Sequence, residues 1–278
     1  LANLVNEAAL MAARAGKRFV AMIDFENAKD KVMMGAERRS MVMTDDEKKL
    51  TAYHEAGHAI VGLHVPQHDP IHKATIIPRG RALGLVLSLP ERDQLSVTRT
   101  KYKSKIAMAM GGKVAEEMVF GPENVTSGAS SDIQQITKIA RAMVMQFGMS
   151  DNLGNIDYAN EQQTYLGPSS PGSHLGPETQ EKIDIEVRKL VDEGYAKAKS
   201  ILKKEKKKLD LLANGLLEYE TLTGREITQV LSGKPLNRDL DDFDEPDEKQ
   251  NKNSVTSIPK TGTTGRKKGG GLKSQPQS

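Results

Sequence analysis

Two histidines four residues apart, with a glutamate directly after the first, are the residues of this chain best suited to chemistry. They are His54 and His58, and Glu55 stands between them in the pattern H-E-x-x-H. On a helix, residues four apart share a face, so both imidazoles can reach one metal ion while the carboxylate borders the same pocket. A zinc ion held in this way activates water, and a neighbouring carboxylate can take the proton of that water. The pattern therefore predicts a zinc site able to hydrolyse a bond.

The sequence around the motif predicts that it lies in a helix. Thr44 and Glu47 have the spacing of a capping box, in which the threonine hydroxyl accepts from the glutamate N–H and the carboxylate reaches back. We expect the helix to begin at Thr44 and to end before Pro66, because proline has no N–H to continue the helical hydrogen bonds. The H-E-x-x-H motif then falls in the middle of this helix.

A second set of histidines, His64, His68 and His72, also recurs every four residues. Pro66 and Pro70 interrupt this set, so these histidines can share no helical face. We expect them in loops or facing solvent, without a metal ion.

Two histidines leave zinc short of a catalytic ligand set, which is usually three protein ligands and an open position for water. The chain has no cysteine, so the third ligand must be a histidine or a carboxylate. His64 stands six residues after His58, but no glycine stands at the position between them that the extended H-E-x-x-H-x-x-G-x-x-H pattern requires. The candidates are Glu116, Glu117 and Asp132, and spacing alone does not choose between them. Asp132 also suits the N-terminus of a helix, where a carboxylate complements the helix dipole.

The composition excludes several other classes of protein. Tryptophan is absent, aromatic residues make up 4% of the chain, and 40 basic residues nearly balance 37 acidic ones, which argues against nucleic-acid binding. The lack of cysteine excludes disulfides and fits a reducing compartment. No run of about 18 apolar residues and no signal segment is present, so we expect the chain itself to be soluble. It begins at Leu1 within a helical pattern, which indicates a piece of a longer protein.

Apolar spacing predicts a mainly α fold with a small β hairpin or sheet. Helices are expected over residues 1–16, 23–33, 44–65, 96–121, 131–148, 178–212 and from 223 onward, and β-like runs over 74–77 and 83–89. Residues 150–177 are rich in Gly, Pro, Ser and Asn and are expected to form a loop. Beyond Pro235 an acidic block gives way to a basic tail without apolar periodicity, which we expect to be disordered.

Up to about residue 235, the chain resembles the FtsH family of membrane-anchored AAA zinc proteases. The motifs that carry the resemblance are, in order, LANLVNEAAL at 1–10, MGAER at 34–38, YHEAGHA at 53–59, IIPRG at 76–80, GGKVAEE at 111–117 and SGASSDI at 127–133. The resemblance implies that Asp132 joins His54 and His58 as the third zinc ligand. It also implies that Glu116 is a carboxylate that orients a ligand histidine, and the general base is then expected to be Glu55.

The resemblance also implies a division of the chain. Residues 1–36 are expected to end the helical lid of an AAA ATPase module, residues 37–235 to form a zincin-type helical protease domain, and residues 236–278 to form the tail. Such a protein would be an ATP-dependent zinc endopeptidase that degrades unfolded, misfolded and membrane proteins. Its ATP and Mg²⁺ would bind upstream of this chain, in a homo-hexamer anchored at the cytoplasmic face of a bacterial cell membrane.

Two other functions compete with this hypothesis. One is a non-catalytic module that assembles the hexamer and carries a vestigial metal site, which substitution of Glu55 would reveal. The other is a zinc hydrolase of small molecules or free peptides. An edge strand within residues 74–89 that is able to pair with an extended polypeptide would favour the protease.

Overall fold

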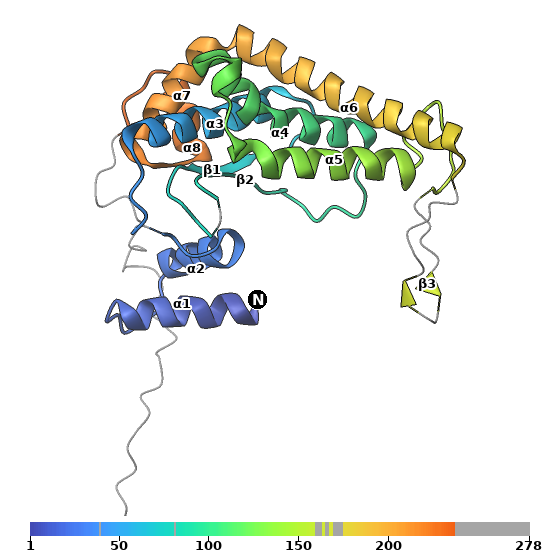
Figure 1. Cartoon of the computed structure of the whole chain (residues 1–278). Coiled ribbons are helices and arrows are strands. Elements are labelled where there is room, and N and C mark those ends of the chain that lie inside the picture. The colour runs from blue at the N-terminus through green and yellow to red at the C-terminus, as the bar shows by residue number, and fades with distance from the viewer. Residues whose placement is uncertain (39, 81, 159–162, 165–166, 169–174, 237–278) are drawn as a thin grey trace, which may run out of the picture. The chain divides into compact units, whose positions relative to one another are not determined.

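The structure is a computed structural model that describes residues 1–38, 40–80, 82–158, 163–164, 167–168 and 175–236. The described elements are α1 (Ala2–Arg14), α2 (Met22–Met34), α3 (Asp45–His64), β1 (Ile71–Thr75), β2 (Leu85–Ser88), α4 (Arg99–Phe120), the 3₁₀ turns η1 (Pro122–Asn124) and η2 (Ser127–Ala129), α5 (Ser130–Met145), β3 (Gln163–Thr164), β4 (Gly167–Pro168), α6 (Pro177–Lys204), α7 (Lys206–Tyr219), β5 (Thr221–Thr223) and α8 (Gly224–Leu231). The expected mainly α fold with a small sheet is confirmed (Figure 1).

The chain divides into two compact units, which are described separately. The described part of the first is residues 1–33, which holds α1 and nearly all of α2. Small side chains allow these helices to pack, since Ala8, Ala12 and Ala28 are fully buried. Ion pairs join Glu7 to Lys31 and Lys17 to Asp24. The two helices match those expected at the start of the chain.

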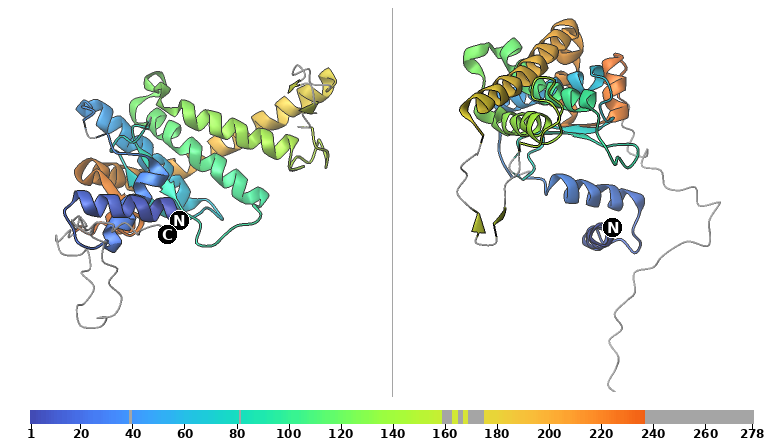
Figure 2. Two further views of the ribbon diagram at one scale, coloured as in Figure 1. Left: turned by 90° about the horizontal axis from the view of Figure 1, so that it is seen from below. Right: turned by 90° about the vertical axis from the view of Figure 1, so that its right-hand side faces the viewer.

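The second unit, from Met34 onward, is built around α3. Every residue of α3 from Thr51 to Gly62 is buried, because α4, α6 and α7 pack against it. The capping box at Thr44 is present, and the helix ends two residues before Pro66, as the sequence predicts. α6 lies beside both α4 and α5 (Figure 1 and Figure 2).

Glycines set the distance between α3 and α4. A Cβ atom added to Gly57 would lie 2.4 Å from the carbonyl oxygen of Gly111, and one added to Gly111 would lie 2.5 Å from the carbonyl oxygen of Gly57. The backbones therefore touch where the helices cross, and the H-E-x-x-H motif sits at this crossing.

The sheet has three antiparallel strands in the order β2-β1-β5. Ala74 of β1 pairs with Val86 of β2 on one side and with Leu222 of β5 on the other. The hairpin of β1 and β2 was expected, but β5 was not. β5 has only three residues and leads directly into the capping box at Thr223, so its sequence shows no strand periodicity.

The segment after α2 is attached to the loop between β1 and β2. The Arg38 N–H donates to the Pro78 carbonyl oxygen at 2.8 Å, and the buried guanidinium of Arg79 donates to Glu37 at 2.5 Å. Two of the motifs that carry the family resemblance therefore contact each other.

The expected helix over 178–212 is wrong, because the structure has two helices here. α6 ends at Lys204, Glu205 has a non-helical backbone with φ −103° and ψ 25°, and α7 continues to Tyr219. The turn lets α7 pack against α3, where the Tyr53 hydroxyl donates to Asp210 at 3.2 Å. Residues 203–208 are all charged, so no apolar position, Gly or Pro marks the turn. Leu202 and Leu209 on either side are seven residues apart, as in one continuous helix, so periodicity does not reveal it.

The second set of histidines shares no helical face, as expected. His64 is the last residue of α3, His68 lies in a loop and His72 lies in β1. The expected loop over 150–177 lies partly outside the described residues, as does the tail beyond residue 236. No helix within the described ranges is long and apolar enough to cross a membrane.

The loop that follows β2 is held by a nearly buried ion pair. Lys101 on α4 bonds to Asp69, and the Gln94 amide bridges them, donating to Asp69 at 2.9 Å and accepting from Lys101 at 2.7 Å. The side chains of Lys101 and Asp69 are only 9% and 14% exposed. Burial raises the pKa of Asp69, but the hydrogen bonds from Lys101 and Gln94 outweigh it and hold this pKa below its usual value.

We expect Asp69→Asn to lower the free energy of unfolding by about 2 kcal/mol at pH 7, because Lys101 stays buried without its opposite charge. A carboxyl with a depressed pKa stabilises the folded state above its unfolded pKa and loses this contribution as the pH falls through the folded pKa. The difference between the variant and the parent should therefore shrink below about pH 4. Urea unfolding at several pH values measures it. Asp151→Asn, which breaks the exposed pair with Arg99, is the control, and an equal loss there would contradict the prediction.

Candidate zinc site

The two motif histidines face each other on consecutive turns of α3. Their Nε2 atoms are 3.0 Å apart, and the rings meet edge to face with centroids 4.6 Å apart. Asp132, the third residue of α5, completes the group: its Oδ2 lies 3.2 Å from Nε2 of His54 and 3.4 Å from Nε2 of His58. Within the described residues, these three side chains form the group able to hold a metal ion.

The donor atoms fit a zinc ion. Four-coordinate zinc binds nitrogen and oxygen at about 2.0–2.2 Å, which makes each edge of the ligand tetrahedron about 3.3 Å. The three observed separations are close to that edge. A set of two imidazoles and one carboxylate also leaves a fourth position for water, as in catalytic zinc sites.

The far nitrogens of both rings have hydrogen-bond partners that aim Nε2 at the site. Nδ1 of His54 lies 2.7 Å from Oε1 of Glu116, and Nδ1 of His58 lies 2.9 Å from the carbonyl oxygen of Met108. An Nδ1–H donated to these acceptors leaves the lone pair on Nε2, which is the tautomer that binds a metal. Glu116 is fully buried on α4, where it can serve this purpose without competition from water.

The electrostatics of the group favour a cation. Burial opposes the charged form of His54, but hydrogen bonds with Asp132 and Glu116 and the charge of Glu55 outweigh burial and raise the pKa of His54 to about 10. Burial raises the pKa of Asp132, but its hydrogen bonds with the two histidines prevail, and this pKa lies well below its usual range. The site therefore attracts positive charge, which a single divalent metal ion bound by all three side chains would supply.

Two glycines make room at the site. A Cβ atom on Gly112 of α4 would lie 2.6 Å from Nε2 of both His54 and His58. A Cβ atom on Gly84, just before β2, would lie 2.6 Å from Oε1 of Glu55. The Glu55 carboxylate thus lies against the start of β2, and burial raises its pKa. A carboxylate with a raised pKa is better suited to accept a proton near neutral pH.

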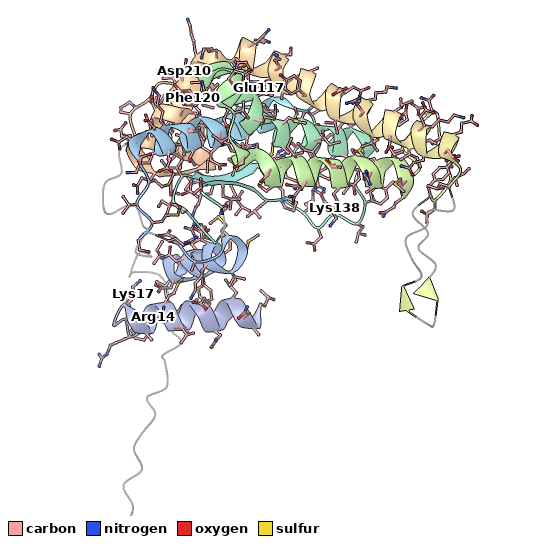
Figure 3. The ribbon with its side chains drawn as sticks, in the orientation of Figure 1. Arg14, Lys17, Glu117, Phe120, Lys138 and Asp210 are labelled. Atoms are coloured by element: carbon pink, nitrogen blue, oxygen red, sulfur yellow. The ribbon has the colours of Figure 1, made fainter. Side chains whose placement is uncertain are left out.

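The structure distinguishes the three candidates for the third ligand by their partners. Asp132 joins the histidines, and Glu116 bonds to the far side of His54. Glu117, which is labelled in Figure 3, has other partners. The Glu117 carboxylate accepts from the Tyr195 hydroxyl at 2.5 Å and pairs with Lys113. The sequence did not predict that Gly84, Gly112 and Met108 contribute to the site, because each of them reaches the site through tertiary contacts.

A histidine pair on one helix, a carboxylate on another and a glutamate beside them define the class of H-E-x-x-H zinc peptidases. Residues 41–230 match the family model for Peptidase family M41, and the chain belongs to this family. It is 56% identical over 241 residues to the ATP-dependent zinc metalloprotease FtsH of Caulobacter vibrioides, covering 86% of this chain and 38% of that protein. The enzymes of the same name from Rickettsia bellii and Haemophilus influenzae are 55% and 50% identical, over 85% of this chain and 37% and 38% of their own lengths. The chain thus spans less than half the length of these curated relatives.

Proposed function

We propose that this chain is the protease portion of an ATP-dependent zinc endopeptidase that degrades unfolded, misfolded and membrane proteins. One observation carries the proposal: three donor atoms of His54, His58 and Asp132 lie within 3.0–3.4 Å of one another, with Glu55 beside them. Membership of Peptidase family M41 and the names of the relatives support the same function.

The roles of the side chains follow from their chemistry. His54, His58 and Asp132 would hold Zn²⁺, and Glu116 and Met108 would keep the two imidazoles aimed at it. When bound, the ion lowers the pKa of a water molecule to about 7 and polarises the scissile carbonyl. Glu55 would take the proton of the attacking water and pass it to the leaving amine, since its carboxylate borders the site.

The sheet supports a polypeptide substrate over a small molecule. Among the described residues β2 is an edge strand, because β1 is its one partner in the three-stranded sheet. Its first residue follows Gly84, which packs against Glu55. An extended polypeptide that adds to this edge by backbone hydrogen bonds would lie beside the general base. Backbone pairing also requires an unfolded segment, which fits degradation of unfolded chains.

The remaining parts of the proposal concern the longer protein. Residues 1–36 would end the lid of the ATPase module, residues 37–235 would form the protease domain, and residues 236–278 would form a tail. ATP and Mg²⁺ would bind upstream, in a homo-hexamer anchored at the cytoplasmic face of a bacterial membrane. The division of the structure near Met33, the relatives' greater length and the term ATP-dependent in their names support this arrangement.

Metal removal tests the function. We expect the full chain to cleave an unfolded fluorescent protein with Zn²⁺, to lose this activity after dialysis against a chelator, and to regain it with one equivalent of Zn²⁺ per chain. Zinc content measured alongside should rise and fall with activity. Cleavage that survives complete metal removal would contradict the proposal, whereas zinc binding without cleavage would favour the non-catalytic assembly module.

A further inference from the structure

The carboxylate of Glu116 is shared between two parts of the protease unit. Its Oε1 lies 2.7 Å from Nδ1 of His54. Its Oε2 accepts from the backbone N–H of Thr126 at 2.9 Å and from the Thr126 hydroxyl at 3.3 Å. A fully buried carboxylate therefore links Thr126 to a histidine of the site.

The same threonine also begins the segment that carries Asp132. The Thr126 hydroxyl oxygen accepts from the Gly128 N–H at 3.2 Å and so caps η2. η2 ends at Ala129, and α5 follows at once with Asp132 as its third residue. α5 has no side-chain cap of its own, since its N-cap residue is Ala129. The orientation of the first turn of α5 thus depends on the short capped turn before it.

The two hydrogen bonds of this hydroxyl are compatible, because a hydroxyl donates one proton and can accept another. It donates to Glu116, which holds His54 of α3, and accepts from η2, which leads to Asp132 of α5. The histidines and Asp132 come from separate helices and must meet to within a few tenths of an ångström. A single side chain that bonds to both Glu116 and η2 is well placed to hold His54 and Asp132 at the right distance from each other.

We propose that Thr126 is a positioning residue of the zinc site, which acts through Glu116 on His54 and through η2 on Asp132. The inference rests on the proposed zinc function and adds to it a residue that is neither a ligand nor in contact with the reacting atoms. Because the backbone N–H of Thr126 also bonds to Glu116, loss of the hydroxyl weakens this link without removing it.

Thr126→Val tests the hydroxyl, since valine keeps the shape of threonine. We expect zinc affinity, measured by competition with a chromogenic chelator, to fall about tenfold, near the lower end of what loss of a ligand's hydrogen-bond partner costs. With zinc held in excess, kcat should fall while KM for an unfolded substrate changes little. Thr126→Ser should restore both. The matched control is Thr137→Val on α5, whose hydroxyl donates within its own helix to the Ile133 carbonyl oxygen at 2.7 Å.

A double variant tests whether Thr126 acts through Glu116. If Thr126 acts through Glu116, then Thr126→Val should lower zinc affinity much less in a Glu116→Gln background than in the parent. Thermal unfolding of metal-free Thr126→Val should remain cooperative, with no more than the small loss of stability that a missing cap costs, which separates positioning from loss of folding. Unchanged zinc affinity in Thr126→Val, a full effect in the Glu116→Gln background, or failure of serine to restore binding would overturn the inference. A parent chain that binds no zinc would instead overturn the proposed function itself.

Discussion

Glu55→Gln is expected to lower kcat for cleavage of an unfolded protein by at least about 100-fold, and up to about 10⁴-fold, while zinc stays bound. Glutamine keeps the shape of the side chain against Gly84 but cannot accept a proton, so the variant removes only the acid–base chemistry. The ligand atoms of His54, His58 and Asp132 are unchanged, and zinc content should remain that of the parent. Initial rates and metal analysis on the same preparation measure both quantities.

The matched control for this variant is Glu117→Gln. Glu117 directly follows Glu116 in the sequence, but its carboxylate bonds to Tyr195 of α6 and to Lys113. We expect this variant to cleave at close to the parent rate. Equal cleavage by Glu55→Gln and the parent would exclude Glu55 as the base and point to a contaminating protease. A scaffold with a vestigial metal site would be indifferent to both substitutions.

Gly112→Ala is expected to lower zinc affinity by at least about 100-fold. The added methyl group would lie 2.5 Å from Cε1 of His54 and 2.6 Å from Nε2 of both histidines, so the rings must move off the ligand position. Alanine favours a helix interior over glycine by about 1 kcal/mol, so helix propensity alone would stabilise the variant. A loss of zinc therefore reports crowding at the ligand atoms and not a weaker helix. Chelator competition measures the affinity, and circular dichroism confirms that the helices persist.

Gly176→Ala provides the comparison for this crowding. Gly176 precedes α6 with a φ of −60°, which alanine adopts without strain, and a Cβ atom there would meet nothing within 4 Å. We expect its zinc affinity to equal that of the parent. If Gly112→Ala bound zinc as tightly, α4 would have to shift away from α3 at no cost, which would contradict the close backbone contact between Gly57 and Gly111.

How much of this site the sequence could predict depends on how far apart its parts lie along the chain. The pairing of His54 with His58 is a local property of one helix, and the capping box at Thr44 fixes where that helix begins. Asp132 is 78 residues beyond His54, so spacing could not favour it over Glu116 or Glu117 as the third ligand. Only the family resemblance singled it out. The sequence predicts the contact that helical geometry sets, and it does not predict the contact that tertiary packing sets.

The fold shows the same contrast between local and long-range contacts. The hairpin of β1 and β2 could be expected from two adjacent apolar runs, whereas β5 joins β1 from 146 residues away in the pairing of Thr75 with Thr221. The turn at Glu205 lacks a local signal, because it lies in the charged run 203–208 and the flanking Leu202 and Leu209 are seven residues apart, as in a single helix. The bend accompanies the packing of α7 on α3. The sequence also gives no signal for the glycines at the site, because these glycines leave space for groups on another helix.

The contact between Gly57 and Gly111 also limits how this sequence can change by mutation. When two side chains collide, a smaller residue at the second position can relieve a larger one at the first. Here the atom met by a new Cβ on Gly57 is the carbonyl oxygen of Gly111, which every amino acid carries. No substitution at position 111 can therefore compensate for Gly57→Ala, and the reverse holds for Gly111→Ala. A genetic selection for restored activity in either variant should return true revertants to glycine, with no suppressor at the facing position.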